Sequence, residues 1–315
     1  MKYLLLLLIS SLFFACAEDD TVQNTEQDIE TATVYSEPTY DVIIQEDITY
    51  AQGLSHESWN SDESEVIDLK LDVYKPDNTI ANKPAIVYIH GGGFVGGDKQ
   101  YEPIPYLGNY FASRGWVFFS LNYRLQSDYG TIPQEWVDVG DLMEESPDQF
   151  LAIYPAQRDC KAALRWVFAN ALDYQVDTSQ VSVSGGSAGA VTAVNLGISA
   201  TADYTSELSI TEDETLNSTN INQSYELQAI VNFWGSGVAV GAINQIYDVE
   251  RYNDQMPPLM IVHGTEDPTV PYSSAIQLKN IYETHGVDYE FYPLEGKGHG
   301  PWACLLYTSP SPRDA

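Results

Sequence analysis

Hydrophobic residues in the central part of the chain gather in short runs, and several runs, such as AIVYIH and LMIVHG, are continuous rather than alternating. Strands that are apolar on both faces are buried on both faces, which is typical of a parallel sheet covered by helices on two sides. We therefore expect strands at residues 69–74, 85–90, 116–121, 181–185, 227–235, 259–264 and 289–294.

The segments between these runs have helical spacing. Cys160, Ala163, Leu164 and Val167 recur on one helical face, which predicts a helix with Cys160 in the core. Strands that alternate with helices predict an α/β fold with a mostly parallel central sheet and helices on both faces. A chain of 315 residues, 44% of them hydrophobic, can fill one substantial core, so we expect one catalytic domain. The predicted helices are at residues 156–173, 188–198 and 272–285.

The composition is strongly acidic, with a formal net charge of -31 from 45 acidic and 14 basic residues. Such a surface repels phosphate backbones, so nucleic acid is not an expected partner. It suits a soluble, exported enzyme.

The N-terminus, MKYLLLLLISSLFFAC, has one Lys, an apolar run and a small residue before Cys16. This pattern predicts an export signal at residues 1–15, because its apolar run is shorter than the roughly 20 residues that span a bilayer. Cys16 resembles a bacterial lipoprotein processing site, which implies a lipid anchor on Cys16 and a periplasmic or cell-surface location. The alternative is an ordinary secretory signal and a secreted protein. Residues 16–47 are acidic and lack apolar periodicity, so we interpret them as a flexible tether.

The end of the chain, CLLYTSPSPRDA, continues no preceding pattern. It resembles translated sequencing-adapter read-through, and we interpret residues 303–315 as a non-native tail, which would lack the helix that normally follows the last catalytic residue. A genuine tail is the alternative. The catalytic domain is then expected at residues 48–302.

Ser187 lies in VSVSGGSAG, after an apolar strand and before a helical segment. Together with Gly185 and Gly189 it forms the pattern G-x-S-x-G, and strand, turn and helix are the context of a nucleophile elbow. The small neighbours let strand and helix approach around a strained serine. We predict that Ser187 is a nucleophile; a solvated serine in a glycine-rich turn is the alternative.

A second glycine-rich motif, HGGGF, follows the strand AIVYIH. Backbone N–H groups aimed at a developing oxyanion stabilise acyl transfer, and the residue after the nucleophile supplies one of them. We predict an oxyanion hole made by Gly92, Gly93 and Ala188. His90 is expected to brace this loop rather than act as a base.

Five histidines are present, and in the fold to which this elbow belongs the catalytic residues follow in the order serine, acid, histidine. This order leaves His285 and His299. His285 ends a helical stretch before a glycine, whereas His299 lies in the loop GKGHG after a strand, so His299 is the predicted general base. The acid that orients it is Glu266 or Asp267, both in the loop after LMIVHG.

With these motifs in order, residues 48–302 resemble bacterial carboxylesterases of the α/β-hydrolase fold, in the hormone-sensitive-lipase-like and feruloyl-esterase-like (BD-FAE-like) group. The segments LKLDVYKP, LNYRL and YPAQRDCKAALRWVFANA also have counterparts in that group. The resemblance favours Asp267 as the acid, because G-T-x-D-x-x-V-P is the pattern around the catalytic acid in these esterases. It implies a Ser187–His299–Asp267 triad without metal or organic cofactor.

The resemblance implies hydrolysis of short-chain or aromatic acyl esters through an acyl-enzyme, on small molecules or on polysaccharide. The alternatives are a serine peptidase of the prolyl-oligopeptidase type and a non-catalytic binding protein of the same fold. Two polar insertions, at residues 126–153 and 200–226, interrupt the pattern. Tyr129, Trp136 and Tyr154 are expected either to roof the pocket or to pack the first insertion.

Overall fold

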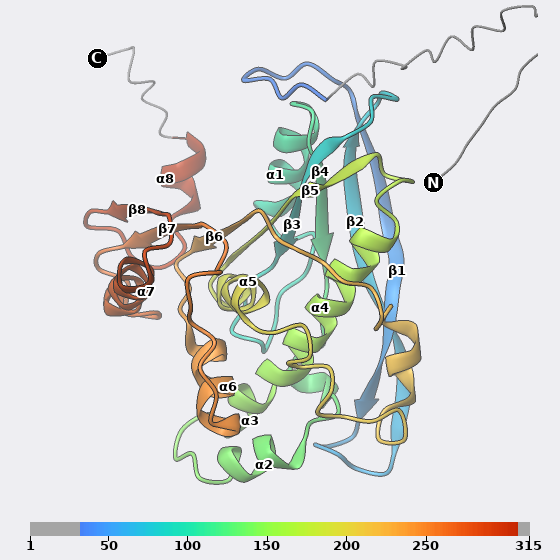
Figure 1. The fold of residues 1–315 in the computed structure, drawn as a ribbon, viewed down its shortest axis with the longest axis vertical. Coiled ribbons are helices and arrows are strands. Elements are labelled where there is room, and N and C mark those ends of the chain that lie inside the picture. Colours follow the sequence, from blue (N-terminus) through green and yellow to red (C-terminus); the bar gives the residue numbers. More distant parts are fainter. Residues whose placement is uncertain (1–31, 308–315) are drawn as a thin grey trace, which may run out of the picture. The chain divides into compact units, whose positions relative to one another are not determined.

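The computed structural model describes residues 32–307. It is built on one eight-stranded sheet with the order β1-β2-β4-β3-β5-β6-β7-β8 (Figure 1). β1 pairs antiparallel with β2 and β2 antiparallel with β4, whereas all other neighbours run parallel. The mostly parallel sheet of the prediction is confirmed. The strands are β1 Val42–His56, β2 Ser64–Pro76, β3 Lys83–Ile89, β4 Val117–Leu121, β5 Val176–Gly186, β6 Ala229–Phe233, β7 Leu259–Gly264 and β8 Tyr289–Leu294.

Each of the seven predicted runs overlaps a strand, and β7 and β8 have the predicted bounds. The predicted boundary between tether and domain at residue 48 is wrong, because β1 begins at Val42 and pairs with β2 from its first residue. The first half of β1 is almost wholly exposed at the edge of the sheet, so its sequence carries little of the apolar signal that marks the buried strands.

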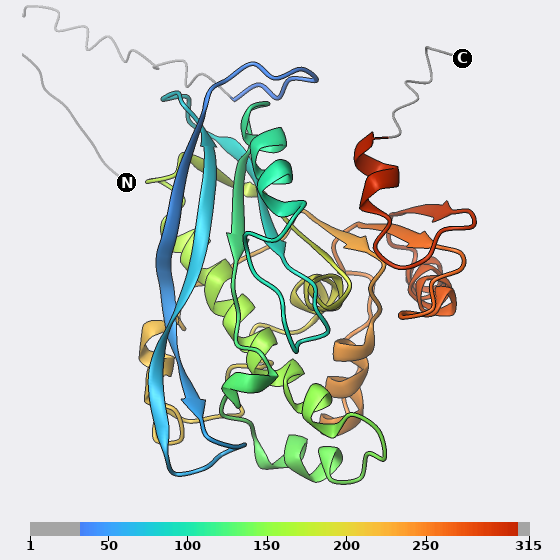
Figure 2. The ribbon, with the colours of Figure 1, turned by 180° about the vertical axis from the view of Figure 1, so that it is seen from behind.

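Alternating residues of the central strands supply two separate cores. On β3, Ile86 and Tyr88 pack with α1 on one face, and Val87 and Ile89 belong to the larger core on the other face. α4 and α5 cover that larger core: in Figure 1 they lie in front of the sheet with α1 behind it, and Figure 2 shows the reverse side. Helices therefore cover both faces, as predicted. The helices are α1 Ile104–Ala112, α2 Gln134–Gly140, α3 Pro147–Leu151, α4 Ile153–Ala169, α5 Ala188–Ile198, α6 Val238–Tyr247, α7 Tyr272–His285 and α8 Trp302–Tyr307, with 3-10 turns η1 Gln126–Asp128 and η2 Glu214–Ser218.

The second insertion is held against α4 by buried charged side chains. Arg158 Nη1 donates to Asp213 Oδ2 at 2.6 Å, and both residues are almost completely buried. Arg165 Nε donates to the carbonyl oxygen of Thr219 at 2.8 Å. This segment is thus an ordered cover of α4 and not a loose loop. Cys160, on the same helix, is fully buried, as its spacing predicted, and its thiol is free.

The first insertion folds as η1, α2 and α3, and its aromatic residues pack inward. Trp136 and Tyr154 have no exposed surface and lie against each other with ring centroids 5.5 Å apart. Tyr129 packs edge-on against Trp59 at 5.2 Å. Of the two alternatives, the one in which these aromatics pack the insertion is confirmed. They do not form a roof over the pocket.

The two ends of the chain are described only in part. The predicted signal at residues 1–15, Cys16 and the tether up to residue 31 lie outside the described residues, as do residues 308–315. α8 extends five residues past the expected domain end at residue 302, so a short helix does follow His299. Between residues 32 and 307, no helix is long and apolar enough to cross a membrane.

Candidate active site

Ser187 sits on the sharp turn between β5 and α5. Its backbone has φ 55° and ψ -122°, a conformation that residues other than glycine rarely adopt. The N–H of Ser187 donates to the carbonyl oxygen of Phe233 at 2.9 Å. A Cβ on Gly185 would lie 2.4 Å from the backbone of Gly189, and one on Gly189 would lie 2.0 Å from the carbonyl oxygen of Ile89. The glycines therefore have the steric purpose that the motif predicted.

His299 and Asp267 meet Ser187 from two neighbouring loops, after β8 and β7. His299 Nε2 lies 2.9 Å from Ser187 Oγ, and His299 Nδ1 lies 2.7 Å from Asp267 Oδ2. A carboxylate only accepts hydrogen bonds, so Nδ1 carries a proton, and in the tautomer with that proton alone the lone pair of Nε2 faces the serine hydroxyl. The three predicted residues thus form one continuous hydrogen-bonded chain.

The alternatives for acid and base lie elsewhere. Glu266 is exposed, whereas the side chain of Asp267 is fully buried against His299. His285 is the last residue of α7, and Gly286 ends that helix with φ 68°. Between the two carboxylates of this loop, the geometry selects Asp267.

Asp267 is held as a carboxylate by its surroundings. Burial opposes its charge, but hydrogen bonds from His299 and from the backbone N–H groups of Val270 and Thr269 outweigh it and lower the pKa of Asp267 below its ordinary value. The two N–H groups lie 2.9 Å and 2.8 Å from Oδ1, which leaves Oδ2 for His299.

The HGGG loop lies directly against the elbow. A Cβ on Gly91 would be 3.2 Å from Ser187 Cβ and 2.7 Å from the carbonyl oxygen of Gly186. Gly92 and Gly93 have φ angles of 120° and 63°, which favour glycine, and both line the same cavity as Ser187. Ala188 is the first residue of α5, where backbone N–H groups have no acceptor within the helix. Gly92 and Gly93 therefore share a cavity with Ser187, and Ala188 follows the serine directly in the chain.

His90 braces this loop, as predicted. It is buried, and its Nδ1 donates to the carbonyl oxygen of Gly91 at 2.7 Å. Its ring stacks on Tyr123 at 4.3 Å, and Tyr123 returns a hydrogen bond to the His90 carbonyl oxygen at 3.0 Å. Burial lowers the pKa of His90 and keeps its imidazole neutral.

Two residues at the site have no counterpart in the sequence prediction. Gln149, from α3, donates to the carbonyl oxygen of Gly93 at 2.8 Å. His263, at the end of β7, is fully buried 3.4 Å from Asp267 Oδ2. Nothing in the polar insertion marks Gln149, because its partner lies far away in sequence. His263 lies four residues before Asp267 in the sequence. The order serine, acid, histidine excludes it as the general base, but it does not exclude another role at the site.

A cavity of about 550 Å³ opens over Ser187 and His299. Its walls carry aromatic and aliphatic side chains. Trp302 packs edge-on against Trp234 with ring centroids 4.7 Å apart, and the ring centroids of Trp302 and Tyr88 are 6.5 Å apart. A substrate that reaches the serine would therefore contact a largely apolar wall. The lining residues include Tyr88, Gly92, Gly93, Tyr101, Pro103, Ile104, Ser187, Trp234, Thr269, His299 and Trp302.

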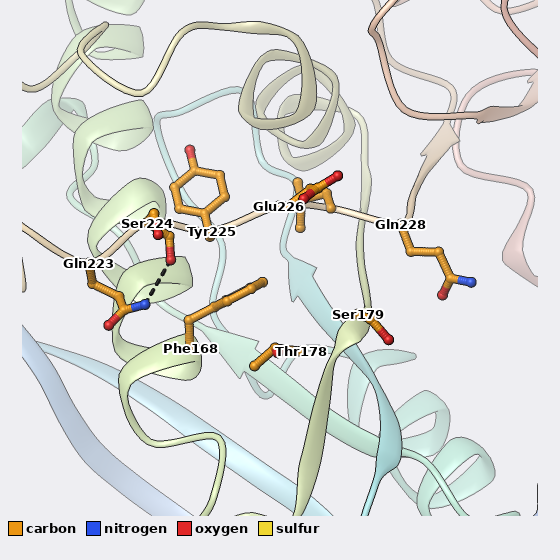
Figure 3. Close-up of a pocket in the computed structure, with 9 residues that line it drawn as sticks. Phe168, Thr178, Ser179, Gln223, Ser224, Tyr225, Glu226 and Gln228 are labelled. Atoms are coloured by element: carbon orange, nitrogen blue, oxygen red, sulfur yellow. Dashed lines mark hydrogen bonds between the residues drawn. The ribbon is translucent and has the colours of Figure 1, made fainter. Parts of the chain in front are cut away.

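A second hollow of about 550 Å³ lies at the opposite end of β5 (Figure 3). Phe168 and Tyr225 contribute rings, and Gln223, Gln228 and Ser179 contribute polar groups. None of the nine residues that line it is a histidine, cysteine, lysine or arginine. Its one ionisable carboxylate is that of Glu226, and the lining lacks the histidine through which a triad activates a serine.

A parallel sheet with a serine on the strand-to-helix turn, linked through histidine to an aspartate, defines the α/β-hydrolase fold, and this chain has that fold. Residues 71–143 and 149–245, more than half of the chain, match the BD-FAE family, and the chain belongs to that family.

Solved structures agree on the fold. Esterase 2 of Thermogutta terrifontis phosphorylated by paraoxon is 25% identical with a TM-score of 0.56, over 79% of this chain and 84% of that chain. A truncated carbohydrate esterase from gut microbiota is 20% identical with a TM-score of 0.58, over 86% of this chain and 93% of the other.

The curated relatives match at similar identity and are longer than this chain. Esterase LipC of Mycobacterium tuberculosis is 23% identical over 73% of this chain and 56% of its own length. The probable carboxylic ester hydrolase LipM of the same organism is 26% identical over 61% of this chain and 35% of its own length. The chain thus spans about half, or less, of the length of these relatives.

Proposed function

We propose that this protein is a serine carboxylesterase that works through an acyl-enzyme on Ser187. The observation that carries the proposal is the hydrogen-bonded chain from Ser187 Oγ to His299 Nε2 at 2.9 Å and from His299 Nδ1 to Asp267 Oδ2 at 2.7 Å. The esterase names of several relatives support it, and they favour it over the peptidase and the non-catalytic alternative.

In this mechanism His299 Nε2 takes the hydroxyl proton as Ser187 Oγ attacks the ester carbonyl carbon. The carbon–oxygen bond to the alcohol then breaks, and the alcohol leaves with the proton from His299. A water molecule, deprotonated by the same nitrogen, attacks the acyl-enzyme and releases the acid. Asp267 holds the imidazole in the required tautomer and stabilises the imidazolium that forms in each half-reaction.

The negative charge of the tetrahedral intermediate needs donors on one side of Ser187. We assign the N–H groups of Gly92, Gly93 and Ala188 to this task, and removal of one such donor typically costs about 3 kcal/mol of transition-state stabilisation. The N-terminal end of α5 adds positive potential at the same place.

The cavity favours neutral esters with a short or aromatic acyl group. Trp234, Trp302 and Tyr88 offer flat apolar surface beside Ser187, and the net charge of -31 disfavours anionic substrates. The proposed substrates are esters of small molecules or of polysaccharides, since the cavity opens at the surface. Paraoxon, which phosphorylates the Thermogutta terrifontis esterase, is expected to inactivate this protein through Ser187.

We also propose that the protein is exported and anchored by lipid on Cys16, so that the catalytic domain acts in the periplasm or on the cell surface. The pattern of residues 1–16 supports this location. Expression of the full chain and of a Cys16→Ser variant in a bacterial host with labelled palmitate tests it. We expect label on the wild-type chain and none on the Cys16→Ser variant. If neither protein is labelled, the lipid anchor is contradicted and residues 1–15 are an ordinary secretory signal.

The proposed activity is tested by assaying wild type and Ser187→Ala on p-nitrophenyl acetate. Loss of the nucleophile of a triad lowers kcat by about a millionfold. Ser179→Ala is the matched control, because Ser179 is exposed at the far end of the same strand and should leave the rate unchanged. Equal rates for wild type and Ser187→Ala would contradict the proposal, and a panel of acetylated xylan, feruloylated sugars and dipeptide amides then separates the substrate classes.

A further inference from the structure

His263 is a buried histidine that the proposed mechanism does not use. It is the last residue but one of β7, has no exposed surface, and lies four residues before Asp267. Its Nε2 is 2.9 Å from the carbonyl oxygen of Val270 and 3.4 Å from Asp267 Oδ2. No partner for its Nδ1 is present among residues 32–307.

These contacts determine where the proton of His263 lies. A carbonyl oxygen and a carboxylate oxygen only accept hydrogen bonds, so Nε2, which faces both, must carry a proton. Burial lowers the pKa of His263 and outweighs the nearby carboxylate, so the ring is neutral and Nδ1 is unprotonated. The Nε2–H of His263 therefore donates to the carbonyl oxygen of Val270, and the contact of this neutral ring with Asp267 Oδ2 at 3.4 Å is not an ion pair.

We propose that His263 is a positioning residue for the catalytic acid, acting through Asp267 and the loop that follows it. The Val270 N–H that holds Asp267 Oδ1 belongs to the residue whose carbonyl oxygen His263 holds. His263 therefore ties this loop to β7 and lies 3.4 Å from Asp267 Oδ2, the oxygen that His299 contacts. The proposal rests on the function proposed above.

The unpaired Nδ1 supports this assignment. A buried nitrogen acceptor without a partner lowers stability, and an apolar side chain would avoid that loss in the core. Local conflicts of this kind tend to occur where a residue serves a site. Here the imidazole supplies an N–H donor to the Val270 carbonyl oxygen, next to the carboxylate of Asp267.

Kinetics of two variants test the proposal on p-nitrophenyl acetate. His263→Leu removes the donor, and we expect kcat to fall between about 10-fold and 100-fold with KM within about twofold, because a small displacement of a catalytic group acts on the transition state. His263→Gln keeps an N–H at similar reach and should recover most of the loss. Wild-type kcat in a folded His263→Leu, or an equal loss in both variants, would overturn the proposal.

A double-mutant cycle separates positioning from a general structural role. If His263 acts through Asp267, His263→Leu should cause little further loss in an Asp267→Ala background. An undiminished loss in that background would overturn the proposal.

Nitrogen-15 NMR of histidine-labelled wild type tests the geometry without any activity measurement. The His263 signals, assigned with His263→Gln, should show a neutral ring protonated at Nε2. A ring protonated at Nδ1 would overturn the inference even if the His263→Leu variant does not fold. Because this measurement needs no substrate, it distinguishes failure of the inference from failure of the proposed esterase activity, which Ser187→Ala tests.

Discussion

Replacing Asp267 with Asn tests how the acid orients the base. Oδ1 accepts two backbone N–H groups at 2.8 Å and 2.9 Å, so an Asn would keep its carbonyl oxygen at that position. Its NH₂ group would then take the place of Oδ2, 2.7 Å from His299 Nδ1. A donor at that position can only face an unprotonated Nδ1, which moves the imidazole proton to Nε2.

The consequence for catalysis can be given a magnitude. With a proton on Nε2, His299 has no lone pair for the Ser187 hydroxyl, and the wrong tautomer in a triad of this kind lowers kcat by about ten-thousandfold. Since the substrate does not contact Asp267 directly, KM should change little.

The assay is the initial rate of p-nitrophenyl acetate hydrolysis by purified Asp267→Asn at neutral pH. Glu266→Gln is the matched control: the adjacent carboxylate is exposed, and its loss should leave kcat within about twofold. An Asp267→Asn variant with more than a tenth of the wild-type kcat would refute the role given to Asp267.

Three further outcomes are expected. Gln149→Ala, which frees the Gly93 carbonyl oxygen, should lower kcat about fivefold, the effect of one neutral hydrogen bond, and an unchanged kcat would exclude this brace. Asp213→Asn leaves the Arg158 charge buried and unpaired and should cost about 3–5 kcal/mol of unfolding free energy in urea titrations. Burial opposes the charge of Asp213, but Arg158 and the other partners outweigh it and lower the Asp213 pKa. The stability that the Asp213 carboxylate contributes is therefore present above about pH 4 and is lost as the pH falls further. If Asp213→Asn were still less stable than wild type at low pH, the pairing would be contradicted. Trp302→Ala should raise KM for a feruloyl ester about tenfold and for a small acetyl ester less, whereas equal changes would argue against an aromatic acyl pocket.

The sheet and the triad were predictable because both leave local marks in the sequence. Buried parallel strands are continuous apolar runs, and in this fold the reactive groups follow the carboxyl ends of strands, which is where Ser187, Asp267 and His299 lie. The choice between Glu266 and Asp267 needed the family pattern first and burial afterwards, since two adjacent carboxylates in a loop look alike in sequence.

The features that were missed depend on contacts distant in sequence. The outer half of β1 is an exposed edge whose pairing with β2 leaves no apolar run. Gln149 reaches Gly93 only because α3 packs beside the HGGG loop, and Trp136 turns inward because Tyr154 and Tyr204 pack against it. Tertiary packing decides such positions, and a local pattern cannot supply it.

The central claim is that Ser187 is an activated nucleophile. Intact-mass and peptide measurements after treatment with a fluorophosphonate, which phosphonylates activated serines, test it most directly. We predict one adduct per chain, on the peptide that contains Ser187, with hydrolysis lost in proportion to labelling and no adduct on Ser187→Ala. Labelling at another residue, or undiminished hydrolysis by a fully labelled protein, would contradict the claim.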